Sequence, residues 1–244
     1  MSSSEQGDPS GEVAAPSPAD SRWDERALYI LTAEHSSLAS ARSLAYNEAF
    51  TRIGNLLSFL SISFVVLALI AQATSFAEPF LGVAAIMLTF DFVIGLITFG
   101  RILGTTSDDL RAVQAMARVR HGYIQIAPHL EPYFSEGTTD DMEGVMRTYR
   151  VPESGPRGVL YALTTSTGMT AIIVALLGGV LAGVLVMLTG IGAGVAFGLG
   201  VTSAVVIFAV MAVAAGWYFV RDQAGLDVRL PSTPPGSASR RGGS

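Results

Sequence analysis

The charged residues of the chain leave three long stretches that are apolar and almost free of charge. Residues 53–77 carry no formal charge, residues 79–100 carry only Asp91, and residues 158–220 carry none. Each of the first two stretches has the roughly 20 residues with which a helix crosses the hydrocarbon of a bilayer. The third is much longer. A single helix over its whole length would extend about 95 Å, so we expect the stretch to fold back on itself.

The break in the third stretch is predicted at the sequence TGIGAG, residues 189–194, because clustered glycines end helices and permit tight reversals. This placement gives spans near residues 166–188 and 195–219. Only a few polar residues separate the first two stretches, which predicts a tight antiparallel turn there as well. The predicted fold class is an all-α membrane protein with four transmembrane helices in two antiparallel hairpins, residues 53–100 and 158–220.

Amphipathic cytoplasmic helices are predicted outside the hairpins. Residues 21–52 place apolar side chains three and four positions apart, which is typical of a helix with one buried face. We expect this helix to continue directly into the first span. The two ends of the chain, residues 1–20 and 221–244, are rich in Pro, Ser and Gly and are predicted to be disordered.

Residues 101–157 are predicted to form a second helical segment. Ser107 is a good N-cap for a helix that opens with two aspartates, and Pro128 should end that helix. A shorter helix should begin near Asp140, with Glu143 as its capping-box partner. We expect these helices to pack together as a small cap. The alternative is that one of them lies flat in the lipid interface.

The distribution of arginine predicts the orientation in the membrane. All fifteen basic residues are arginine, and none lies in either short turn between spans. Because basic residues remain on the cytoplasmic side, both termini and residues 101–157 should face the cytoplasm. The absence of lysine and the wealth of Ala, Gly and Val suggest a bacterial inner membrane. A net charge of −5 gives no general attraction to nucleic acid.

Asp91 is the one acid expected inside a span. In an antiparallel hairpin that turns near residue 77, the position at the same depth on the first helix is Ser63, with Ser61 one step shallower. No basic residue lies in any span, and a low dielectric favours the neutral carboxyl group. Asp91 is therefore either a proton- or cation-binding site or a neutral side chain that joins two helices by hydrogen bonding.

Glycine recurs in the last hairpin at spacings that let helix backbones approach closely. The glycines concerned are Gly179, Gly183, Gly190, Gly194 and Gly198. The alternative is that such spacings arise by chance in spans rich in Gly and Ala. The pattern fits packing within one chain and packing in a homo-oligomer equally well.

Two stretches of the sequence resemble a group of uncharacterised bacterial integral membrane proteins. These stretches are LTAEHSSLASARSLAYNEAFTRIG, residues 31–54, and RVRHGYIQIAPHLEPYF, residues 118–134. The resemblance covers roughly residues 25–135 and implies a membrane protein without implying an activity. Its polar positions are candidate contacts for a cytoplasmic protein: Glu34, His35, Arg42, Asn47, Glu48, Arg120, His121 and Tyr123. The alternative is that they anchor the hairpin at the bilayer surface.

The sequence lacks a nucleophile motif, a phosphate-binding loop and metal-ligand spacing, so we expect neither an enzyme nor a bound metal or cofactor. The main hypothesis is a structural or regulatory membrane module that binds a cytoplasmic protein through its cap. The alternative is an oligomeric channel or transporter that uses Asp91. A membrane enzyme is the third and least supported hypothesis.

Overall fold

The computed structural model describes residues 18–75, 78–149 and 156–232, and the regular structure in these ranges is entirely helical. Four helices are long and apolar enough to cross a membrane: α1 (Pro18–Thr74), α2 (Glu78–Ile126), α5 (Ser166–Leu188) and α6 (Ala193–Ala224). The shorter helices are η1 (Pro128–Tyr133), α3 (Met142–Tyr149) and α4 (Pro156–Thr164). The all-α class and the four apolar helices predicted from the sequence are confirmed.

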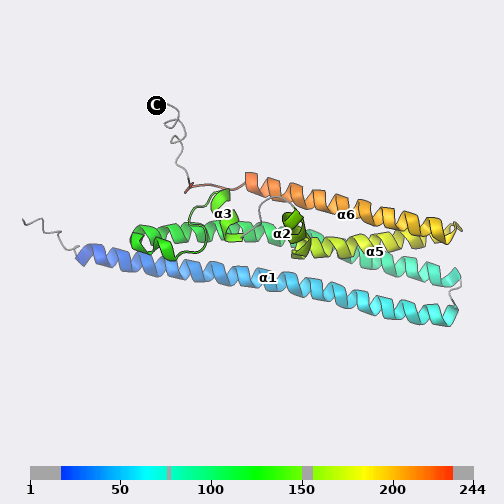
Figure 1. Ribbon diagram of the computed structural model, residues 1–244. Coiled ribbons are helices and arrows are strands. Elements are labelled where there is room, and N and C mark those ends of the chain that lie inside the picture. Colours follow the sequence, from blue (N-terminus) through cyan, green and yellow to red (C-terminus); the bar gives the residue numbers. More distant parts are fainter. Residues whose placement is uncertain (1–17, 76–77, 150–155, 233–244) are drawn as a thin grey trace, which may run out of the picture.

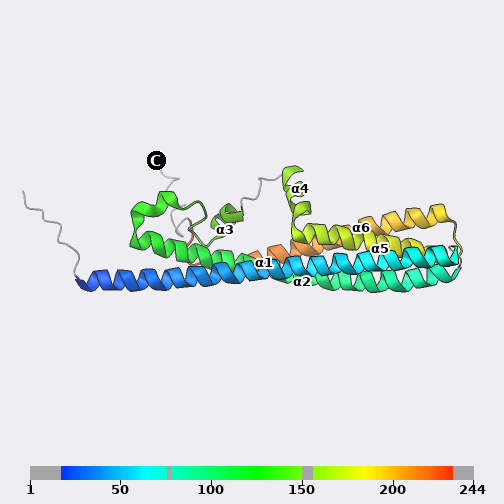
Figure 2. The same ribbon diagram turned by 90° about the horizontal axis from the view of Figure 1, so that it is seen from below.

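The four long helices lie side by side (Figures 1 and 2). The end of α1, the start of α2 and the turn between α5 and α6 lie at one end of the molecule, and η1 and α3 lie toward the other. Leucines of α1, α2 and α5 form a common core: Leu56, Leu60, Leu67, Leu88, Leu177 and Leu181. The outward side chains of the apolar segments are also apolar, since Ile86 is 72% exposed and Phe64 52% exposed.

Helices α1 and α2 form one continuous antiparallel pair. The less exposed residues of α1 recur at alternating three- and four-residue spacings, as in a coiled-coil seam. Leu31 of α1 packs against Gly122 of α2, and Ser63 contacts Asp91. The number of residues from Leu31 to Ser63 along α1 is almost the same as the number from Gly122 back to Asp91 along α2. The register therefore does not slip between the polar and the apolar half of the pair.

The helix boundaries correct two predictions, one at the start of α1 and one inside α2. Helix α1 begins at Pro18, so the last three residues of the predicted N-terminal tail are helical; residues 1–17 lie outside the described residues. No helix begins at Ser107, because α2 runs through it without a break. The Ser107 hydroxyl donates to the carbonyl of Leu103 at 3.4 Å and to the carboxylate of Asp222. Buried Leu103 and Leu110 continue the apolar face across this position.

Helix α3 is capped by a different residue from the one predicted. The Asp141 carboxylate accepts the N–H of Gly144 at 3.0 Å, as an N-cap side chain does. The carboxylate of Asp140 instead accepts hydrogen bonds from the C-terminal part of the chain. Glu143 lies 3.4 Å from the hydroxyl of Ser232 and does not complete a capping box.

The prediction of a disordered tail from residue 221 onward is wrong for residues 221–232. Helix α6 continues to Ala224, and residues 225–232, called the strap below, lie against α2 and α3. Leu226 of the strap packs on three buried residues of these helices, Leu110, Val113 and Val145. Residues 233–244 lie outside the described residues.

Small residues bring α5 and α6 into close contact. A Cβ atom on Gly179 would lie 2.7 Å from both the carbonyl oxygen of Gly200 and the Cβ of Ala204. A Cβ atom on Gly183 would lie 3.4 Å from the carbonyl oxygen of Ala196. At Gly179 and Gly183 the backbones of α5 and α6 therefore approach closely within the chain.

The other three predicted glycines have different roles. Gly190 lies in the turn between α5 and α6 with φ of +78°, a conformation that favours glycine. Hypothetical Cβ atoms on Gly194 and Gly198 would have nothing within 4 Å. The packing face of α6 is therefore the stripe of Ala196, Gly200 and Ala204, about half a turn around the helix from the predicted one.

Candidate functional site

Asp91 is buried on the face of α2 that packs against α1. It is 1% exposed. The hydroxyl of Ser63 donates to its Oδ1 at 3.0 Å, while its Oδ2 has no hydrogen-bond partner among the described residues. Ser63 thus lies at the depth that the sequence predicted. Ser61 is not part of this site, because it is exposed and its hydroxyl donates to the carbonyl of Leu57 at 2.8 Å.

The surroundings of Asp91 suit a proton better than a metal ion. Leu60 and Leu67, which flank Ser63 on the seam, are buried. A Cβ atom on Gly95 would lie 2.9 Å from Val174, so α5 closes on α2 about one turn away. One carboxylate and one hydroxyl fall short of the roughly six oxygen ligands of Ca²⁺ or Mg²⁺. Among the described residues no group of three His, Cys, Asp or Glu side chains could hold a metal ion.

A second buried aspartate, Asp109, connects three helices in the polar half of the molecule. Its Oδ1 accepts from Arg42 Nε of α1 at 2.5 Å. Its Oδ2 accepts from the hydroxyls of Tyr46 at 3.0 Å and Tyr149 at 2.6 Å. Burial raises the pKa of the Tyr149 hydroxyl, and the neighbouring Asp109 carboxylate adds to the rise. Burial alone would lower the pKa of Arg42, but Asp109 outweighs it and the pKa is raised.

Three more of the predicted residues, His35, Arg120 and Tyr123, lie together beyond Asp109. The His35 and Tyr123 rings are 6.1 Å apart. Arg120 is 5% exposed, pairs with Glu136 and donates to the carbonyl of Gly137 at 3.2 Å. Burial, and next the nearby Arg120 charge, lower the pKa of the His35 imidazole. This cluster fixes the loop after α2 to the end of α2.

The remaining predicted contact residues do not share one site. Glu48 pairs with Arg52 at 2.6 Å and with Arg101 at 3.5 Å, and the hydrogen bond from Arg52 lowers the pKa of the Glu48 carboxyl. Glu34 is exposed and His121 is half-buried. Neither makes a hydrogen bond or ion pair with another described residue.

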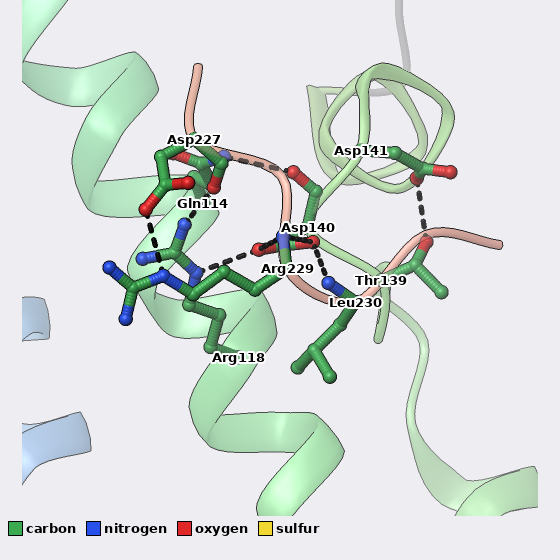
Figure 3. A network of polar contacts seen from close by, with 8 residues as sticks. All are labelled: Gln114, Arg118, Thr139, Asp140, Asp141, Asp227, Arg229 and Leu230. Atoms are coloured by element: carbon green, nitrogen blue, oxygen red, sulfur yellow. Dashed lines mark hydrogen bonds and ion pairs between the residues drawn. The ribbon is translucent and has the colours of Figure 1, made fainter. Parts of the chain in front are cut away.

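Figure 3 shows a network between the strap and the rest of the polar half. Asp140 is fully buried. Its carboxylate accepts from Arg118 Nε at 2.7 Å and from the backbone N–H groups of Arg229 at 2.9 Å and Leu230 at 2.7 Å. Gln114 donates to the backbone carbonyl of Asp140 at 3.0 Å and to that of Asp227 at 3.1 Å. The strap is therefore held mainly by its backbone.

The strap also lowers the pKa values of the two adjacent aspartates. Burial alone would raise the pKa of Asp140, but the hydrogen bonds from Arg118, Arg229 and Leu230 outweigh it and lower the pKa. In Asp141, hydrogen bonds led by Ser232 outweigh burial in the same way and lower the pKa to about 2. This network was not predicted, because the local sequence at Asp140 indicates a helix start and the composition of residues 225–232 indicates a disordered tail.

No protein-family model matches the chain, and no curated protein or solved structure is similar to it. The described residues contain two regions that could carry a function. The first is the apolar site around Asp91. The second, called the cap below, is the end of the molecule that contains the polar ends of α1 and α2 together with η1, α3 and the strap.

Proposed function

We propose that the chain is a multi-pass protein of a bacterial inner membrane, with two antiparallel hairpins and with the cap and both termini in the cytoplasm. The exposed apolar side chains of the four long helices support insertion into lipid, because such a surface is unfavourable in water. The arginines support the orientation, because basic residues remain on the cytoplasmic side and none lies in either turn between spans.

Labelling of terminal tags tests this orientation. Tags at either end should be labelled only after the inner membrane of spheroplasts is permeabilised. A cysteine introduced in the turn, at Gly192, should react with an impermeant maleimide in intact spheroplasts, and the natural chain contains no cysteine to interfere. Labelling of the terminal tags in intact spheroplasts would contradict the orientation.

Within this arrangement the cap acts as a docking module for a cytoplasmic protein. The observation that carries this function is a hydrogen-bonded cap that exposes large apolar side chains. Within the cap, the Asp109 network joins α1, α2 and α3, and the Asp140 network joins the strap to α2. Tyr29 is 77% exposed, Ile30 65% and Tyr133 82%, all in the cap rather than in the apolar half. Exposed apolar and aromatic side chains on a rigid surface are typical of protein interfaces.

Affinity capture from native membranes, followed by mass determination of the intact complex, tests the docking function. A cytoplasmic protein should be captured by the wild type and by Gln125→Ala, a control at an exposed residue of the cap on α2. It should be lost from Ile30→Asp and from Tyr133→Asp. Equal capture by all four proteins, or capture of no protein, would reject docking through these side chains.

A second candidate function is a proton pathway through Asp91. The observation that favours it is the buried Oδ2 of Asp91, which has no hydrogen-bond partner among the described residues. Acids buried within membrane spans commonly serve transport. In proteoliposomes the wild type should then carry a proton flux that Asp91→Asn abolishes, while Ser61→Ala leaves it unchanged. Equal flux through wild type and Asp91→Asn would reject this function.

A further inference from the structure

The strap is bound mainly through its backbone, which bends at Arg229 and Leu230. Four residues, Gln114, Arg118, Asp140 and Asp141, form what we call the strap site. They bind the carbonyl of Asp227 and the N–H groups of Arg229, Leu230 and Ser232. The backbone N–H of Asp140 also donates to the carbonyl of Leu230 at 3.2 Å. Hydrogen bonds to the backbone give affinity in peptide recognition, and side-chain pockets give selectivity.

The side chains of the strap contribute one apolar anchor. Leu226 packs on the buried cluster of α2 and α3. In contrast, Val228 is 45% exposed, and the Arg229 side chain is 68% exposed and pairs only with Asp227 of the strap itself. The strap site therefore recognises a segment that has a leucine at its start, free N–H groups three, four and six positions later, and a bend at the first two of these N–H groups.

The strap site and its ligand belong to separate parts of the chain. All four residues of the site lie on α2 or just before α3, whereas the strap follows α6. Gly225 is the single residue between the end of α6 and Leu226. A site built without any residue of α6 remains complete whichever copy of the chain supplies the strap.

We propose that the strap site also binds the strap of a second copy, so that two neighbouring copies exchange their straps. The inference rests on the orientation proposed above. Copies inserted with one orientation present every strap and every site at the same height above the membrane, so exchange requires only lateral approach. Residues 225–232 would span at most about 27 Å if fully extended, and they span less when bent as in the site. An exchanged strap makes the same contacts as before, which makes such swapping a low-cost route to a dimer.

A fall in pH within the physiological range does not release the strap from the strap site. The pKa of Asp141 is about 2 and that of Asp140 is also lowered. The hydrogen bonds of both carboxylates are therefore fully present above the ordinary aspartate pKa of 3.8 and are lost only as the pH falls through the lowered values. At neutral pH the strap is displaced by an equivalent strap rather than by protonation of the site.

Two complementary full-length variants test the exchange. Asp140→Asn weakens the site and keeps the strap, whereas Leu226→Asp removes the apolar anchor of the strap and keeps the site. When the two variants are co-expressed with different tags, only a strap in trans can restore the native contact. Capture of one tag should then recover about tenfold more of the other than when both tagged chains carry the same variant. Equal recovery from mixed and identical pairs would overturn the proposal.

A cross-linking arm keeps the test decisive if either variant folds poorly. Ser232 Oγ lies 3.4 Å from Glu143 Oε2 and both residues are exposed, so a short thiol cross-linker should join Ser232→Cys to Glu143→Cys. A chain with both cysteines is the positive control. Separately tagged chains with one cysteine each should give cross-linked dimers if straps exchange. Cross-linking within the double-cysteine chain but not between single-cysteine chains would overturn the exchange. Failure of the orientation itself would appear in the tag-labelling experiment.

Discussion

Asp91 and Asp109 occupy equivalent positions on one helix and have opposite environments. Their separation along α2 is close to a whole number of helical turns, about five, and they are 1% and 7% exposed. Asp109 receives hydrogen bonds from an arginine and two tyrosines. Asp91 receives one from a serine. The two halves of the same α1–α2 seam thus accommodate a buried carboxyl group in different ways.

This difference shows how each half of the pair is stabilised. In the polar half, an ionised carboxylate is supported by a cation and by O–H donors, so charge fixes α1, α2 and α3 together. In the apolar half, the described residues offer no cation, and the contacts are those of leucines and of small residues. A neutral Asp91 costs little there, whereas an ionised one would be expensive.

The largest expected effect is that of Arg42→Ala. The substitution leaves the Asp109 carboxylate buried without its cation, and breaking one side of a buried pair is strongly destabilising. We expect a loss of about 3 kcal/mol in the free energy of unfolding, measured by denaturant titration in bicelles. Arg52→Ala, which removes an exposed partner of Glu48, should leave the unfolding midpoint unchanged. Equal effects of the two substitutions would contradict the special role of the Asp109 network.

The same substitution at the two aspartates gives the most direct comparison. Asp109→Asn removes the charge that Arg42 needs and should cost about 2 kcal/mol. Asp91→Asn replaces a neutral carboxyl group by an amide of nearly the same shape and should change stability by less than about 0.6 kcal/mol. The measurement is the same unfolding titration for both variants. A large loss for Asp91→Asn would indicate that Asp91 is ionised in the folded protein.

Much of the fold follows from the sequence because the membrane limits the alternatives. Long stretches with no charge, or with Asp91 alone, define the four apolar helices, and the break at residues 189–194 follows from the glycines there. Ser107 shows the limit of local signals. Serine is a favoured N-cap residue, but the buried neighbours Leu103 and Leu110 keep α2 helical through Ser107.

The candidate sites were less predictable, because they depend on contacts between distant parts of the chain. The pairing of Ser63 with Asp91 followed from a count of residues on either side of a turn. In contrast, the composition of residues 221–244 is typical of disorder, and its only large apolar residues are Leu226, Val228 and Leu230. The hydrogen bonds that order the strap go to its backbone, and backbone groups leave no signature in a sequence.

An intermediate effect is expected where α5 and α6 pack in the apolar half. Gly179→Ala places a Cβ atom 2.7 Å from the carbonyl of Gly200, so the helices must separate, at a cost of about 1 to 2 kcal/mol. Gly198→Ala is the matched control, because its Cβ atom meets open space. The unfolding titration should show no loss for Gly198→Ala. Similar results for the two alanines would mean that close packing of small residues does not stabilise this half.

Ser63→Ala should give the smallest measurable loss, because it removes the only hydrogen bond that the described residues make to Asp91. Hydrogen bonds between helices in a membrane contribute on average about 0.6 kcal/mol, so a loss of that size is expected in the unfolding titration. Ser61→Ala should cost nothing measurable, because its hydroxyl bonds only within α1. In the Asp91→Asn background the effect of Ser63→Ala should remain, since an amide oxygen also accepts from a hydroxyl. If instead Ser63→Ala cost several kcal/mol, Asp91 would be a charged group that depends on Ser63, as Asp109 depends on Arg42.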